Sequence, residues 1–329
     1  MSAAADSARI TAGINFLTRP VRGLLKLSPA DALFETRGFP KSNASSQSAL
    51  ERIGRVFIGG FNASLAATDL GAVLQYVDGV PIAERGFAAE GATMGAAVAD
   101  AQPFSRPMFP GCIAAFKSDF TYLAHVGSGW ALARVPWRRK RILAPLDQVH
   151  AWLAIDGLGF HDTYFYHRSV VGGWRRKQSG YATHAYDQGV GRALWFVSGG
   201  SIAAAIRLIS SLATDRQRDL WSGLGLAMTY AGPVACDDVI DAVKAAGENA
   251  ASFAQGVAFA CEARALAHYL PDHTELVARE VWNMGPDEVA KLVREARNGL
   301  PDAETDPPRY QIWRESVACA FTRSAKGAS

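Results

Sequence analysis

The residues best suited to chemistry are a histidine and an arginine that interrupt a pattern of small residues. His161 stands four positions after Gly157, and Arg192 stands three positions after Gly189, where the other copies of the pattern are small or apolar. A histidine can transfer protons near neutral pH, and an arginine supplies a permanent positive charge. We expect His161, Arg192 and Glu90 to act as catalytic groups. A buried histidine and an ion pair between helices are the competing interpretation.

The distance between His161 and Arg192 along the chain is close to one period of the pattern. Equivalent positions on packed neighbouring helices lie about 8–10 Å apart, so we expect the two side chains to share one site. Asp156 or Asp187 would then orient the imidazole of His161.

Polar residues directly precede several of the glycines. If the units stack, these residues come from equivalent places and would line one strip of a concave surface. The alternative is that the acidic ones cap helix N-termini, where they satisfy free N–H groups. The residues are Glu90, Asp156, Asp187 with Gln188, Ser222 and Gln255.

Four large aromatic residues are candidates for binding an apolar substrate. We expect Trp130, Phe160, Trp195 and Trp221 to form an aromatic wall beside the polar groups.

Two segments carry metal-ligand residue types, but their spacing is unfavourable. His161 and His167 are six positions apart, which places them on different sides of a helix. The segment "DDVID", residues 237–241, resembles the Mg²⁺ motif of all-helical isoprenoid cyclases, but the second motif of those enzymes is missing, and an acidic first turn of a helix gives the same pattern. We therefore predict no metal site, leave any cofactor open, and keep the cyclase as a minor alternative.

These residues belong to a repeat that organises most of the chain. Glycines recur about every 33 residues, and a small residue stands four positions after nearly all of them. Small residues one turn apart let two helix backbones approach closely. With no clear strand signals, this pattern predicts an all-α array of about seven degenerate helical hairpins, curved or closed, with capping helices. The first glycines of the copies are Gly60, Gly91, Gly127, Gly157, Gly189, Gly223 and Gly256.

The ends of the chain differ from the middle. Residues 1–45 are predicted to form an N-terminal arm or cap, residues 46–300 the helical-repeat domain, and residues 301–329 a linker and a C-terminal capping helix.

Composition excludes some functions and favours a cytoplasmic protein. The 329 residues are 49% hydrophobic and carry a net charge of +3, far from the one-sided charge of a nucleic-acid binder. No signal peptide and no transmembrane run is visible. The segments "RPVRGLLK", "WRRKR" at 137–141 and "WRRK" at 174–177 mix apolar residues with clustered positive charge, as surface-lying membrane segments do, and the alternative is a solvated basic face.

The segments "ERGFAAEGATMGAA", "GSGWALAR", "DGLGFHD", "DQGVGRALWFV" and "DLWSGLGLAMTYAG" together resemble the bacterial family named domain of unknown function 1702. The resemblance runs from about Arg55 to Trp313. It implies an accessory role in enediyne-type polyketide biosynthesis, on a linear polyene, and assigns no reaction. Position 162 is Asp where relatives tend to carry Glu. The family motifs match at Glu90, Trp130, Arg134, Asp156, His161, Gln188, Arg192, Trp195 and Trp221.

Two classes of function stay open at this point. The first is an enzyme acting on a long apolar polyene, with Arg134, Asp156, Asp162, Asp187 and Gln188 joining the aromatic residues in binding. The second is a non-catalytic scaffold or binding module for a polyene or for partner proteins of the pathway.

Overall fold

The computed structural model describes residues 23–41, 43–103, 105 and 107–327, and in these residues it is all-α. Residues 1–22 of the predicted N-terminal arm, with the first half of "RPVRGLLK", lie outside the described residues. The seven glycine copies fall on seven long helices. These are α3 (Ala44–Ala66), α5 (Ile82–Asp100), α7 (Thr121–Arg134), α9 (Trp152–Val171), α10 (Ala182–Val197), α12 (Thr214–Ala231) and α14 (Ala250–Leu266).

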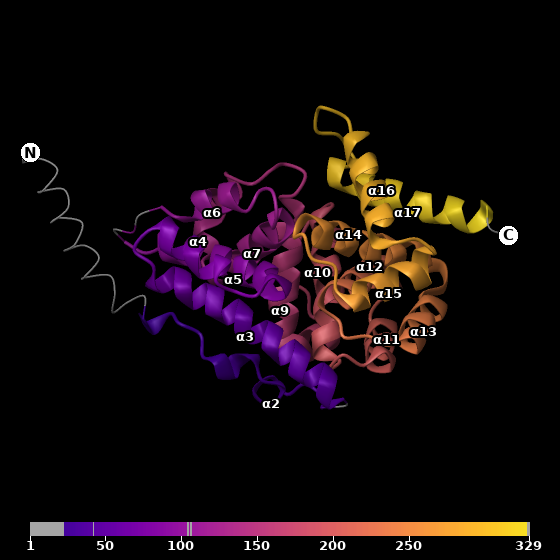
Figure 1. Cartoon of the computed structure of the whole chain (residues 1–329), viewed down its shortest axis with the longest axis horizontal. Coiled ribbons are helices and arrows are strands. Elements are labelled where there is room, and N and C mark those ends of the chain that lie inside the picture. Colours follow the sequence, from indigo (N-terminus) through magenta and orange to yellow (C-terminus); the bar gives the residue numbers. More distant parts are fainter. Residues whose placement is uncertain (1–22, 42, 104, 106, 328–329) are drawn as a thin grey trace, which may run out of the picture.

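The long helices follow one another across the molecule in chain order (Figure 1). Each packs against the long helix before it and the one after it, from α3 to α14. Other helices connect or flank them: η1 (Pro29–Ala32), α2 (Phe34–Arg37), α4 (Leu70–Asp78), α6 (Phe109–Ala115), η2 (Pro136–Arg138), α8 (Arg139–Leu143), α11 (Ile202–Ser211), α13 (Cys236–Ala246), η3 (Gly247–Asn249), α15 (Asp272–Trp282), α16 (Pro286–Asn298) and α17 (Arg309–Gly327).

Not every unit is a pair of helices. No helix is assigned between α9 and α10. That connection contains Gly173 and Gly180, both with positive φ (96° and 56°), a conformation that glycine adopts without the penalty a side chain would bring.

The glycines are sites where helix backbones touch. An added Cβ atom at Gly189 would overlap the carbonyl oxygen of Asp156 on the preceding helix α9. An added Cβ atom at Gly191 would overlap the carbonyl oxygen of Leu220 on the following helix α12. Since positions two apart on a helix are about 200° apart around its axis, the two glycines of one Gly-x-Gly motif serve opposite neighbours.

The same rule holds for the other Gly-x-Gly copies. The first glycine of each motif lies against a backbone carbonyl of the preceding long helix, and the second lies against a carbonyl of the following one. The first glycines and their neighbours are Gly127 with Glu90, Gly157 with Val126 and Gly223 with Gln188. The second glycines and their neighbours are Gly129 with Ala154, Gly159 with Tyr186 and Gly225 with Phe253. The motif is therefore an element of helix packing in the middle of a helix, which agrees with the predicted close approach of backbones.

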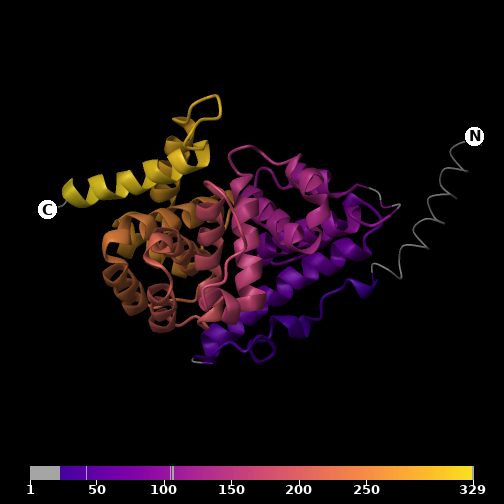
Figure 2. The same cartoon turned by 180° about the vertical axis from the view of Figure 1, so that it is seen from behind.

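The two ends of the chain pack differently. Residues 23–41 run along α3, where the side chain of Asn62 accepts a hydrogen bond from the Leu27 N–H (3.0 Å) and donates one to the Leu27 carbonyl (2.8 Å). At the other end α17 buries Tyr310 and Trp313 completely, and its last turns extend away from the other helices (Figures 1 and 2).

Candidate functional site

An apolar cavity lies between the N-terminal segment and the long helices α3 to α12. The space between atoms along it amounts to about 700 Å³, including space open to solvent, and its wall includes Leu27 and Asp31 of the N-terminal segment. Two charged residues of the helical array, Glu90 and Arg192, belong to the lining. Aromatic rings supply much of the remaining wall: Phe57, Phe87, Trp130, Phe160, Tyr164, Phe165, Phe196 and Tyr230.

Glu90 is the acidic group that the long helices contribute to this cavity. It precedes Gly91, and because Gly91 packs against the backbone of α3, the side chain of Glu90 is turned about 100° away from that contact. Its Oε1 accepts a hydrogen bond from Trp130 Nε1 (3.1 Å). Burial raises the pKa of Glu90 to about 7, although the nearby charge of Arg192 opposes the shift. Glu90 is therefore divided between its acid and base forms near neutral pH.

Arg192 forms an ion pair across the interface of α9 and α10. Its Nη1 donates to Asp156 Oδ1, and its guanidinium lies 5.1 Å from the centre of the Phe160 ring. Burial raises the pKa of the Asp156 carboxyl, and the charge of Arg192 opposes that shift. Arg192 Nε and Asp156 Oδ2 have no hydrogen-bond partner among the described residues. The pair is thus electrically neutral but incompletely hydrogen-bonded.

Tyr230 adds a polar group that the sequence analysis missed. Its hydroxyl is buried, has no hydrogen-bond partner in the described part of the chain, and belongs to the cavity wall. Tyr230 lies in the quoted segment "DLWSGLGLAMTYAG", seven positions after Gly223, so it returns to the face of that glycine after two turns of helix. That spacing is the signal that could have found it.

His161 does not line the cavity. Its ring packs against Trp130 (5.6 Å between centroids) and Phe165 (4.8 Å), and its Nδ1 lies 3.3 Å from Asp162 Oδ1. Burial lowers the pKa of His161, which favours the neutral imidazole, although the neighbouring Asp162 opposes the shift. Asp162 is held in turn by Arg176, whose Nε donates at 2.7 Å, and by the Tyr186 hydroxyl at 2.9 Å.

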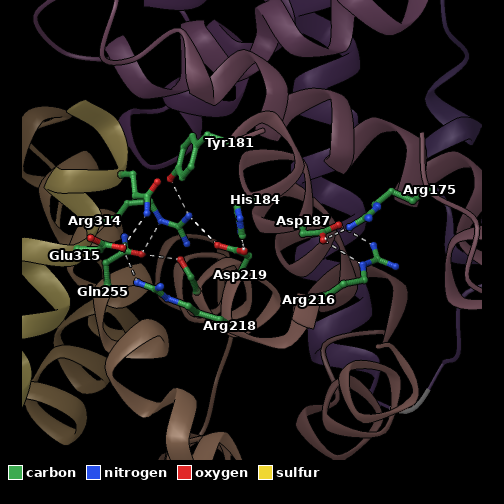
Figure 3. A network of polar contacts seen from close by, with 12 residues as sticks. Arg175, Tyr181, His184, Asp187, Arg216, Arg218, Asp219, Gln255, Arg314 and Glu315 are labelled. Carbon is green, nitrogen blue, oxygen red and sulfur yellow. Dashed lines mark hydrogen bonds and ion pairs between the residues drawn. The ribbon is translucent and has the colours of Figure 1, made fainter. Parts of the chain in front are cut away.

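The structure shows no contact between His161 and Arg192 within the described residues. Asp156, expected to orient the imidazole, pairs with Arg192 instead. Asp187, the other candidate, accepts hydrogen bonds from Arg175 and Arg216 (Figure 3). Trp130 links His161 to Glu90 instead, since its ring packs against His161 while its indole N–H donates to Glu90 Oε1.

The remaining candidates have other surroundings. Gln188 Oε1 accepts a hydrogen bond from the Tyr310 hydroxyl (3.2 Å), and Trp195 Nε1 donates to the Gly232 carbonyl (3.1 Å). Trp221 packs against Phe253, and the guanidinium of Arg134 lies over the Phe165 ring. Of the twelve candidates, Glu90, Trp130, Phe160 and Arg192 line the cavity, whereas Arg134, Asp156, His161, Asp162, Asp187, Gln188, Trp195 and Trp221 do not.

The polar residues that precede the glycines are inside the molecule. Instead of lining an exposed strip, Glu90, Asp156, Gln188, Ser222 and Gln255 are all 5% exposed or less. Asp156 and Asp187 lie inside their helices and pair with arginines, rather than capping helix ends.

Within the described part of the chain, no group of three or more His, Cys, Asp or Glu side chains is arranged to hold a metal ion. In the "DDVID" segment, Asp237 and Asp241 are exposed on α13, and Asp238 Oδ2 accepts a hydrogen bond from the Ala235 N–H at the start of that helix.

Fold and site together define an all-α array of stacked helices around an apolar cavity with a buried carboxyl–arginine cluster. The chain belongs to the family described as a protein of unknown function, DUF1702, whose sequence model matches residues 17–321. Neither the curated proteins nor the solved structures contain a match to this chain. Among the described residues, no helix has both the length and the apolar character needed to cross a membrane.

Proposed function

We propose that this protein binds a long apolar molecule of the polyketide polyene class in the cavity and moves a proton on it, as an accessory enzyme of enediyne-like biosynthesis in the cytoplasm. The observation that carries the proposal is the position of Glu90, a carboxyl group with a pKa of about 7 in a cavity whose wall is mostly apolar and aromatic. Proton-transfer groups act best when their pKa is near the working pH. The pathway itself is an expectation from the family resemblance.

The geometry suits a shift of double bonds along a conjugated carbonyl chain. Ionised Glu90 would remove a proton from a carbon of the substrate, and the electron pair would move through the chain onto the carbonyl oxygen. The Arg192 guanidinium, whose Nε is unpaired, would stabilise that oxygen anion. Protonated Glu90 would then return the proton to a different carbon, so that substrate and product are isomers.

Product analysis with and without the protein tests this proposal. A host that makes the polyene is expected to yield a changed product when the protein is present, and in D₂O the isolated reaction should place deuterium on the isomer. Glu90→Gln keeps an oxygen for the Trp130 hydrogen bond but cannot transfer a proton, so we expect it to abolish the change.

Glu262 provides a matched control. It is also a buried carboxyl with a pKa raised by burial to about 7, but its partner is Arg294 and it does not line the cavity. Glu262→Gln should leave the product unchanged. Equal loss in both variants would contradict a specific role for Glu90.

A non-catalytic binding module is the second candidate. It is favoured by the Asp156–Arg192 pair, which already neutralises the arginine without a ligand. A changed yield with an unchanged product, and no deuterium in the recovered polyene, would select this function over the enzyme.

We also propose that the protein contacts a membrane surface. Trp137 in η2 is 70% exposed and Trp174 is 44% exposed, each beside a run of Arg and Lys. The basic segments 137–141 and 174–177 lie close together, since Arg139 of the first and Arg176 and Lys177 of the second line the same surface cleft. Tryptophan beside clustered positive charge suits the interface of an anionic membrane.

A further inference from the structure

A second, polar pocket lies between α10, α12, α14 and α17 (Figure 3). The space between atoms along it amounts to about 350 Å³, including space open to solvent, and it shares no lining residue with the apolar cavity. Its inner part is formed by Gln255 and Arg314, which are 1% and 7% exposed. Its rim is formed by the more exposed side chains of His184, Arg218 and Glu315.

Arg314 reaches into this pocket from the C-terminal helix. Its Nη1 donates to Asp219 Oδ1 (2.8 Å) and to the Tyr181 hydroxyl (3.1 Å), and its Nε donates to Gln255 Oε1 (3.1 Å). These bonds attach α17 to α12 and α14 and fix the plane of the guanidinium. No hydrogen bond from its Nη2 to another described residue is present.

Gln255 offers a donor that nothing in the described chain accepts. Its Oε1 receives hydrogen bonds from Ser222 Oγ (2.8 Å) and Arg314 Nε, which fixes the orientation of the amide. The Nε2 group is buried and has no partner among the described residues. An unpaired buried donor costs about 1–3 kcal/mol. Docking of α17 explains the contacts of Arg314, but it does not satisfy this amide.

His184 completes the rim as half of an aspartate–histidine pair. Its Nδ1 lies 2.8 Å from Asp219 Oδ2 and donates to it, which leaves Nε2 available. That hydrogen bond raises the pKa of His184, and Asp187 adds to the effect from a longer distance. Arg218 Nη2 and Glu315 Oε1 are 3.3 Å apart on the opposite part of the rim.

We propose that this pocket binds the carboxylate group of a small organic acid. Gln255 Nε2, Arg314 Nη2 and protonated His184 Nε2 are donors without acceptors, and neighbouring N–H groups suit the two oxygens of a planar carboxylate. The charges select a monoanion. Arg218 and Arg314 are balanced by Asp219 and Glu315, so protonation of His184 leaves one positive charge, whereas a phosphate dianion would leave the site negative.

Histidine NMR provides a direct test. The His184 imidazole signals, assigned by their absence in His184→Gln, are followed while sodium acetate is added to the full chain at constant ionic strength set with sodium chloride. We expect a saturable shift and a rise in the pKa of His184. Because the carboxylate prefers the protonated imidazole, binding should weaken as pH rises through that pKa. A shift that never saturates overturns the proposal.

Two variants and one control separate this site from general charge effects. Gln255→Glu keeps the acceptor but replaces the free N–H groups with a second oxygen, so it should abolish saturation. Arg218→Gln, on the exposed rim, should weaken acetate binding by about threefold and keeps the test valid if Gln255→Glu fails to fold. Arg207→Gln, at an exposed position of α11, should have no effect on acetate binding.

Three outcomes contradict the proposal. The first is acetate binding that is unchanged in both Arg218→Gln and Gln255→Glu. The second is acetate binding that is weakened as much in the control Arg207→Gln as in Arg218→Gln. The third is tighter binding of inorganic phosphate than of acetate, measured at the same His184 signals. The last result would leave an anion site but remove its assignment to a carboxylate.

Discussion

At the scale of single residues, the most informative group is Glu90, because its raised pKa ties stability to pH. Below about pH 4.5 Glu90 is protonated in both the folded and the unfolded chain, so its ionisation does not affect the free energy of unfolding there. Between pH 4.5 and about 7 the unfolded chain loses the proton first, which favours unfolding. The contribution of Glu90 to stability is therefore full at low pH and is lost as pH rises through 7.

Glu90→Gln should remove this pH dependence. A shift from 4.5 to about 7 corresponds to about 3 kcal/mol, so we expect the variant to gain up to that amount relative to the wild type at pH 8–9. Urea unfolding of both proteins from pH 4 to 9 measures the difference in their free energies of unfolding. Glu262 titrates in both proteins, so its effect cancels in that difference. Parallel curves would show that Glu90 is ionised normally.

Single residues also show the limit of sequence reasoning. Glu90, Trp130, Phe160 and Arg192 could be selected from the glycine pattern and the family resemblance, and the structure brings these four to one cavity. The partner of Asp156 could not be selected, because it depends on how α9 and α10 are rotated against each other. Asp156 meets Arg192 across that interface, whereas His161, five positions further along the same helix α9, points about 140° away from Asp156.

At the scale of elements, the long helices could be predicted from the sequence because glycine and other small residues recur at a nearly constant spacing of about 33 residues. The sequence pattern located all seven copies and their close backbone contacts. It did not show that the two glycines of a motif such as Gly189 and Gly191 serve different neighbours, since a single helix face was assumed. It also did not separate helical from irregular connections, which depend on local turns such as the one at Gly173.

Gly223→Ala should be costly even though alanine favours helices. Its Cβ atom would overlap the Gln188 carbonyl oxygen and come within 2.6 Å of the Arg192 backbone nitrogen, and neither atom can move alone. Overpacking of this kind costs roughly 1–3 kcal/mol, and Gly223→Leu should cost at least as much.

Gly79→Ala is the matched control for this substitution. Gly79 is exposed at the end of α4, and its nearest neighbours would lie at an ordinary 3.5 Å from an added Cβ atom. Its effect on the free energy of unfolding should stay within about 0.5 kcal/mol. Equal stability of the two variants in urea would count against close helix contact at Gly223.

At the scale of the whole molecule, the exposed tryptophans make membrane contact testable. The protein should sediment with vesicles of phosphatidylcholine and phosphatidylglycerol but not with vesicles of phosphatidylcholine alone. Replacing Trp137 and Trp174 with Ala should reduce the bound fraction severalfold, because indole rings anchor at the interface. Ile240→Ala removes another exposed apolar side chain, on α13, and should change nothing. Binding that ignores both lipid charge and the tryptophans would refute membrane contact.

The two glycines of each Gly-x-Gly motif, which face opposite neighbouring helices, also limit how the length of this protein can change by insertion or duplication. One residue inserted between Gly189 and Gly191 would turn the second glycine by about 100° and direct a larger side chain at the backbone of α12. A duplicated block of one whole period would instead bring its own pair of glycines, one for each new neighbour. Such an array can lengthen by copying units, while each motif inside it tolerates no change of spacing.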